Sequence, residues 1–199
     1  MTAAAGWLAG VLGLAGFIPY IISIIRKETT PNRATWLIWT LVGVMLGGSY
    51  YAGGATDTIW VAVSYVAGPF IIFILSIRRG EGGWTGIDKA CLFTAAASAF
   101  FWWFTGSALI GLCLSLLADV MGAAPTVVKA FRRPEGEDKL SWTLWALSGL
   151  INLAAIDDWA AFSIVAYPAY MLICAGTVTA LLYLRHPAPR PYRPDASEP

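Results

Sequence analysis

The chain of 199 residues is poor in the residue types that metal sites and many active sites need. It has one histidine, His186, and three cysteines without a CxxC spacing. It also lacks the HExxH, GxSxG and P-loop patterns of metalloproteases, serine hydrolases and nucleotide-binding proteins. The sequence therefore offers no His-based metal or catalytic site and no cofactor signature, and we expect the protein not to be an enzyme.

Charge is scarce as well. Only 13% of the residues are Asp, Glu, Lys or Arg, whereas 58% are hydrophobic, and the mean hydropathy is +0.66. Soluble domains carry about 25% charged residues. The formal net charge of +1 gives no reason to expect a nucleic-acid partner. This composition predicts an all-α integral membrane protein.

Long apolar runs divide the chain into seven predicted membrane-spanning helices. About 20 apolar residues cross a hydrocarbon core roughly 30 Å thick. The runs lack the polar stripes, at a spacing of 3.6 residues, that a soluble helical protein would need. The hydropathy criterion places the spans at residues 5–25, 35–53, 58–77, 90–106, 107–128, 142–156 and 159–184.

The distribution of charge predicts the orientation. All 13 Lys and Arg residues lie between spans 1 and 2, 3 and 4, or 5 and 6, or after span 7. The alternate connections carry only Asp57, Asp157 and Asp158. Cytoplasmic loops of membrane proteins are rich in Lys and Arg. We therefore expect a protein of the cell (plasma) membrane with its amino terminus outside and its carboxyl terminus in the cytoplasm.

One stretch of the sequence occurs twice. TWLIWTLVG at residues 35–43 returns as SWTLWALSG at residues 141–149, an offset of 106. The offsets 106 and 99 also pair prolines: Pro19 with Pro125, and Pro69 with Pro168. We interpret this pattern as an internal duplication of a three-helix unit.

The duplication predicts two parallel three-helix repeats joined by a single linker helix. A three-helix unit ends on the opposite side of the membrane from its start, so one further crossing lets both copies enter in the same orientation. The predicted parts are the first repeat (1–80), the linker helix (81–106), the second repeat (107–184) and a disordered, Pro-rich cytoplasmic tail (185–199).

Aromatic residues cluster at two kinds of place. Trp36 and Trp39 open the second span at its cytoplasmic end, and for Trp36 we predict a place in the interfacial aromatic belt. The run FFWWF at residues 100–104 is most simply an interfacial, lipid-facing surface. On this interpretation the tryptophans serve mainly as interface anchors.

Asp119 is the one acidic residue inside a predicted span. It lies about 12 residues, or roughly 18 Å, from the outer end of that span, where an ionised carboxylate costs about 2.5–3.5 kcal/mol. It could be a protonatable group in a transport path or a substrate contact, or it could simply hold helices together. The other copy has Gly13 at the equivalent position, which favours the functional interpretation, because a structural lock would be expected in both copies.

Other polar residues could line a central cavity. Asn152 lies near mid-membrane, opposite Leu46 of the first copy, and its amide suits a hydroxyl or carbonyl ligand. An interhelical hydrogen bond worth about 0.6 kcal/mol is an equally good interpretation. We also predict polar aromatic side chains around the substrate, from Tyr50, Tyr65 and Tyr167.

The pattern resembles the PQ-loop superfamily. A proline near the cytoplasmic end of a helix, a basic turn and a Trp-bearing second helix occur in both copies. The seven-helix layout with an outside amino terminus is similar to that of the SWEET sugar transporters; lysosomal cystine and cationic amino-acid exporters and the KDEL receptor are related. The Pro-Gln dipeptide itself is replaced by Pro19-Tyr20 and Pro125-Thr126.

The resemblance implies a small-molecule transporter with a mid-membrane substrate site between the repeats. It gives the helix prolines the role of hinges for alternating access: Pro19, Pro69, Pro125 and Pro168. By similarity to the cystine exporters, Asp119 becomes a candidate for proton coupling.

Two other functions stay open at this point, a ligand-binding receptor or sensor and a lipid-binding structural protein on the same scaffold. The expected partners are a small-molecule substrate and membrane lipids, and the sequence leaves room for a homo-oligomer.

Overall fold

The computed structural model describes residues 2–52, 59–82 and 86–184. This part of the chain is helical, as predicted, and each predicted span overlaps one of its seven α-helices. The predicted tail at 185–199 lies outside the described residues. The helices are α1 (Thr2–Ile25), α2 (Arg33–Ala52), α3 (Ile59–Arg79), α4 (Gly86–Thr105), α5 (Ala108–Arg132), α6 (Lys139–Leu153) and α7 (Phe162–Leu184), and a short 3-10 helix, η1 (Pro134–Gly136), precedes α6.

Three of the described helices are long and apolar enough to cross a membrane: α1, α5 and α7. They contain 24, 25 and 23 residues, so they measure roughly 35–38 Å at 1.5 Å per residue. Large apolar side chains cover much of the outer surface; Val11 and Ile18 of α1, for example, are 58% and 61% exposed. This exterior suits a lipid surrounding and is compatible with a membrane location.

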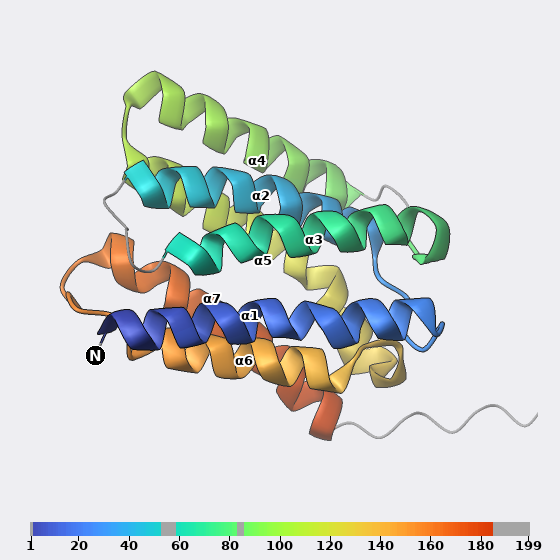
Figure 1. The fold of residues 1–199 in the computed structure, drawn as a ribbon. Helices are drawn as coiled ribbons and strands as arrows, with labels where there is room; N and C mark the ends of the chain where they lie inside the picture. The colour runs from blue at the N-terminus through green and yellow to red at the C-terminus, as the bar shows by residue number, and fades with distance from the viewer. Residues whose placement is uncertain (1, 53–58, 83–85, 185–199) are drawn as a thin grey trace, which may run out of the picture.

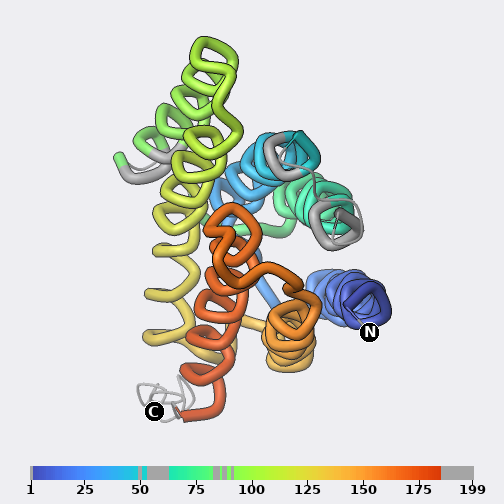
Figure 2. The backbone as a smooth tube through the Cα atoms, turned by 90° about the vertical axis from the view of Figure 1, so that its left-hand side faces the viewer, coloured from blue at the N-terminus to red at the C-terminus, as the bar shows by residue number. Residues whose placement is uncertain are grey.

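Six of the helices form a closed ring around the centre of the molecule (Figure 2). The order around the ring is α2, α3, α1, α6, α7 and α5, and α5 contacts α2 again. Helix α4 lies outside the ring against α5 and α2, at the upper edge in Figure 1. In each half the third helix contacts the other two: α3 contacts α1 and α2, and α7 contacts α5 and α6.

The helices α2 and α6 begin in the same way. The Asn32 side-chain oxygen accepts a hydrogen bond of 3.1 Å from the Thr35 backbone nitrogen, and Asp138 accepts one of 2.8 Å from the Ser141 nitrogen. Such N-caps satisfy an amide that has no partner within the helix. The two capping residues are 106 positions apart, which is also the offset of the repeated stretch.

Removal of these caps tests how much each contributes to the stability of the fold. Asn32→Ala is expected to lower the free energy of unfolding by about 1 kcal/mol. Asp138→Ala is expected to cost more, because the Asp138 carboxylate also accepts a hydrogen bond from the Ser23 hydroxyl of α1. Denaturant titration of helicity by circular dichroism measures both. Glu135→Ala, an exposed position in η1, is the control, and equal losses in the two cap variants would contradict the role of Ser23.

Glycines bring neighbouring helices into backbone contact. A Cβ built on Gly43 of α2 would lie 2.7 Å from the Tyr65 carbonyl oxygen of α3. A Cβ on Gly149 of α6 would lie 2.9 Å from the Leu172 backbone nitrogen of α7. These two glycines are at equivalent positions of the repeated stretch, so in each half the second helix packs closely against the third at the same point of the second helix.

Candidate binding cavity within a ring of tryptophans

The four tryptophans of the repeated stretches contact one another across the two halves. Within each stretch, the ring centroids of Trp36 and Trp39 are 4.9 Å apart, and those of Trp142 and Trp145 are 5.0 Å apart. Between the halves, Trp36 lies 6.1 Å from Trp145, and Trp39 lies 6.1 Å from Trp142. Each indole thus contacts two others, and we call this set the tryptophan ring.

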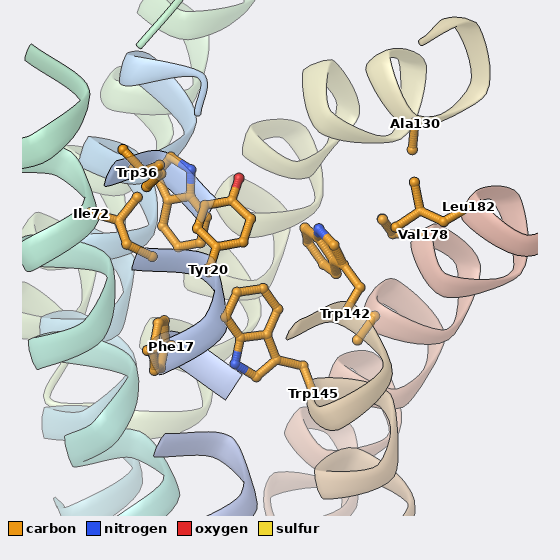
Figure 3. Packing of buried hydrophobic residues seen from close by; sticks show 11 residues of the cluster. Phe17, Tyr20, Trp36, Ile72, Ala130, Trp142, Trp145, Val178 and Leu182 are labelled. Carbon is orange, nitrogen blue, oxygen red and sulfur yellow. The ribbon is translucent and has the colours of Figure 1, made fainter. Parts of the chain in front are cut away.

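The burial of this ring contradicts the predicted belt position of Trp36. Trp36, Trp142 and Trp145 are each only 3% exposed, and Figure 3 shows all three turned toward the packed interior. Hydropathy places a residue along a helix axis but not around it, and these helices carry no polar stripe that would reveal their inner face. The FFWWF run differs, since Trp103 of α4 is 82% exposed, as a lipid-facing surface requires.

Glycines on the first helix of each half make room for side chains at or beside the tryptophan ring. A Cβ on Gly16 of α1 would lie 2.5 Å from Nε1 of Trp145. A Cβ on Gly122 of α5 would lie 2.9 Å from Ile38 and 3.9 Å from the Trp39 ring. Gly16 and Gly122 are again 106 residues apart, but only Gly16 lies tightly against the tryptophan ring, whereas Gly122 makes room for Ile38 of α2.

The two halves differ in the hydrogen bonding of their indoles. Nε1 of Trp145 donates a 3.1 Å hydrogen bond to the Gly13 carbonyl oxygen. Nε1 of Trp39, the equivalent tryptophan, is buried and has no hydrogen-bond partner among the described residues. The position equivalent to Gly13 is Asp119. The difference between the copies therefore brings an unpartnered donor and a carboxylic acid to the same region.

A cavity of about 50 Å³ adjoins the tryptophan ring. All six helices of the closed ring contribute to its wall. A water needs about 10–15 Å³ of such space, so the cavity holds only a few waters; typical ligand pockets are about 300–1,000 Å³. The structure therefore contains a constricted central cavity. Besides the four tryptophans, its lining includes Phe17, Tyr65, Pro69, Asp119, Tyr167 and Cys174.

The structure brings three of the five predicted substrate-site residues to this cavity: Asp119, Tyr65 and Tyr167. The two tyrosine rings meet edge to face at 6.5 Å. Asn152 does not line the cavity; it is 2% exposed, and its Oδ1 has no hydrogen-bond partner in the described part of the chain. The side chain of Tyr50 lies outside the described residues.

Among the described lining residues, Asp119 is the single charged one. Its carboxylate interacts electrostatically with Tyr170 and Cys174 of α7. The Tyr170 hydroxyl is buried beside the carboxylate but completes no hydrogen bond of good geometry. Within the described residues, no group of three His, Cys, Asp or Glu side chains could hold a metal ion. The described lining of the cavity is thus mainly aromatic and contains one carboxylic acid, Asp119.

All four predicted hinge prolines lie inside helices. Pro19 is in α1, Pro69 in α3, Pro125 in α5 and Pro168 in α7. A proline within a helix removes one backbone hydrogen bond and favours a bend there. Pro69 also lines the cavity. The positions suit bending next to the cavity, and the hinge role itself stays a prediction.

A buried polar cluster closes the molecule beside the tryptophan ring, on the side of the Lys- and Arg-rich connections. The Glu137 carboxylate accepts hydrogen bonds of 2.9 Å from the Tyr20 hydroxyl and from the Trp142 indole. Its other oxygen pairs with Lys129 Nζ at 2.9 Å, and Lys129 also donates to the Thr30 carbonyl oxygen. We call these contacts the Glu137 cluster; they connect α1, α5, α6 and the connection between α1 and α2.

Glu137 was not among the predicted site residues. It lies in a highly charged connection, where a carboxylate is usually solvated, yet its side chain is only 2% exposed. A signal was present: the first copy has Pro31 where the second has Glu137, and Ser23 where the second has Lys129. The comparison between copies that singled out Asp119 would have singled out this pair too.

Comparison with known proteins adds no assignment. No family model matches the chain, and the comparisons with curated proteins and with solved structures found no match either. A helical bundle by itself does not specify a function, because function depends on the site that the fold carries. The function must therefore be inferred from the cavity, its single carboxylate and the cluster that closes it.

Proposed function

We propose that the protein is a small-molecule transporter of the PQ-loop type. In this proposal all seven helices span the cell membrane, with α1–α3 and α5–α7 as parallel repeats and α4 as the linker. The amino terminus is outside, and the connections that carry Lys and Arg face the cytoplasm. The central cavity is the substrate site.

The observation that carries the proposal is the position of the cavity between the halves. Every helix of the closed ring contributes to its wall, so a movement of one half against the other changes its size and its access. Alternating-access transporters bind their substrate at such an interface, near the middle of the membrane. The similar helix contacts, caps and glycine positions of the two halves support the parallel repeats.

The Glu137 cluster would be the cytoplasmic gate in a closed state. Its contacts connect α1, through Tyr20, to α5, through Lys129. Pro19 directly precedes Tyr20, and Pro125 lies four residues before Lys129. A bend at either proline would therefore displace a gate residue. In this arrangement a bend at the predicted hinges would separate Glu137 from its hydrogen-bond donors Tyr20 and Lys129.

Asp119 would take part in the transport cycle. It is the only charged side chain among the described lining residues, which are otherwise mostly aromatic and apolar, and an ionised carboxylate in such surroundings is costly. Protonation or a bound substrate would relieve that cost. The two events would then compete at the same group, which is the basis for coupling substrate movement to a proton.

A labelling experiment tests alternating access without knowledge of the substrate. Cys174 lines the cavity, so a Cys91→Ser/Cys113→Ser protein reports on access there. With a membrane-impermeant maleimide, Glu137→Gln and Tyr20→Phe are expected to speed labelling of Cys174 from the cytoplasmic side and to slow it from the outside. The measurement uses right-side-out and inside-out vesicles. A protein with only Cys113, which is exposed on α5, should not respond.

The direction of the change decides between the functions. Faster labelling of Cys174 from one side of the membrane together with slower labelling from the other is what alternating access predicts for a transporter. Labelling that is unchanged on both sides, in variants that remain folded, would contradict the proposed gate and favour a receptor or a lipid-binding structural protein.

A further inference from the structure

We propose that the cavity binds a small organic cation that carries a hydroxyl group, with the cationic head against the indole faces and Asp119 as its counter-charge. This inference rests on the proposed function and names the class of molecule that the central site would take.

The charge of the wall gives the first argument. Asp119 is acidic, and none of the described lining residues is Lys, Arg or His. An anionic ligand would face the carboxylate without a compensating cation. A cationic ligand would instead give the partly buried carboxylate a counter-charge, because an unpaired charge in apolar surroundings is unfavourable.

The aromatic content gives the second argument. Seven aromatic side chains line the cavity, and a cation over an aromatic face gains from about 0.5 to 2 kcal/mol, with indole the best partner. The N–H groups of Trp142 and Trp145 already donate to Glu137 and Gly13. These two rings therefore offer π-faces, not polar edges, to a ligand.

The polar groups give the third argument. A sugar would need several hydrogen-bond partners, and a metal ion would need several oxygen, nitrogen or sulfur ligands; the wall has one carboxylate and few other polar groups. The buried N–H of Trp39 has no partner among the described residues, and it can bond only to an acceptor. A hydroxyl oxygen on the ligand would supply that acceptor.

Choline and its neutral analogue 3,3-dimethylbutan-1-ol test this directly, because the two have nearly the same shape and differ in charge. Isothermal titration calorimetry on the full-length protein in detergent is expected to show choline binding at least about ten-fold more tightly than the neutral alcohol. Asp119→Asn should remove most of that preference. Trp39→Phe should weaken the binding of both molecules, since it removes the N–H and keeps a ring. Asp157→Asn, at an exposed turn, is the matched control.

The outcomes separate this inference from the proposed function. Equal affinity for the two molecules would overturn the inference, and so would the absence of choline binding by folded wild-type protein. If Asp119→Asn does not fold, Trp39→Phe still tests the site. Choline binding without uptake into proteoliposomes would keep the cation site and contradict the transporter. Uptake of an uncharged metabolite without choline binding would support the transporter and contradict the cation site.

Discussion

Replacement of Lys129 by methionine is expected to lower the free energy of unfolding by about 3–5 kcal/mol. The Lys129 and Glu137 side chains are only 6% and 2% exposed and lie 2.9 Å apart. Methionine fills a similar volume but leaves the Glu137 carboxylate buried without its cation, with only the neutral donors of Tyr20 and Trp142. The loss should appear in thermal or denaturant unfolding of the detergent-solubilised protein.

The double variant Lys129→Met/Glu137→Gln should be more stable than Lys129→Met alone. A neutral glutamine can still accept hydrogen bonds from Tyr20 and Trp142, and no charge is left unpaired, so a double-mutant cycle should show strong coupling. Arg132→Met, an exposed position in the last turn of the same helix, should change stability by less than about 0.5 kcal/mol. A loss below about 1 kcal/mol for Lys129→Met would show that water reaches the pair.

Gly43→Ala and Gly149→Ala are each expected to cost about 1–3 kcal/mol. In an open helical position the same change gains up to about 1 kcal/mol, because alanine is the better helix former. At these two sites the added methyl would meet backbone atoms of Tyr65 and Leu172 at 2.7 and 2.9 Å. A backbone cannot rotate away as a side chain can, so the helices of each half must separate.

The control for this prediction is Gly176→Ala in α7, where an added Cβ would meet no atom within 4 Å. It should be neutral or stabilising in the same unfolding assay. The costs of the two tight sites should be nearly additive, because they lie in different helix pairs. A stabilising Gly43→Ala would mean that α2 and α3 are further apart than the structure has them.

The positions of the helices could be predicted from the sequence because hydropathy reports on position along the chain. Each apolar run became a helix, and the repeated stretch predicted equivalent starts for α2 and α6. The rotation of each helix about its axis could not be predicted, because the runs are apolar on all sides. The predicted belt position of Trp36 is wrong for this reason, since the side chain is only 3% exposed.

The candidate site was partly predictable for a similar reason. A carboxylate within an apolar run, such as Asp119, is conspicuous in the sequence, and it lines the cavity. The burial of Glu137 depends on Tyr20, which is 117 residues away in the chain, and local composition carries no information on such a contact. Asn152 shows the opposite case, since it is buried at a position that does not line the cavity.

The short length of α6 has a consequence for the surrounding bilayer. Its 15 residues extend only roughly 22 Å, against about 30 Å for an average hydrocarbon core. In the proposed seven-span arrangement the lipids beside α6 would have to thin by several ångströms, at a modest cost for each ångström of mismatch. Leu147 and Leu150 on its outer face are half exposed, so in that arrangement lipid would contact this short helix directly. The protein would then favour thinner membranes, or a second copy would cover α6 and remove the mismatch.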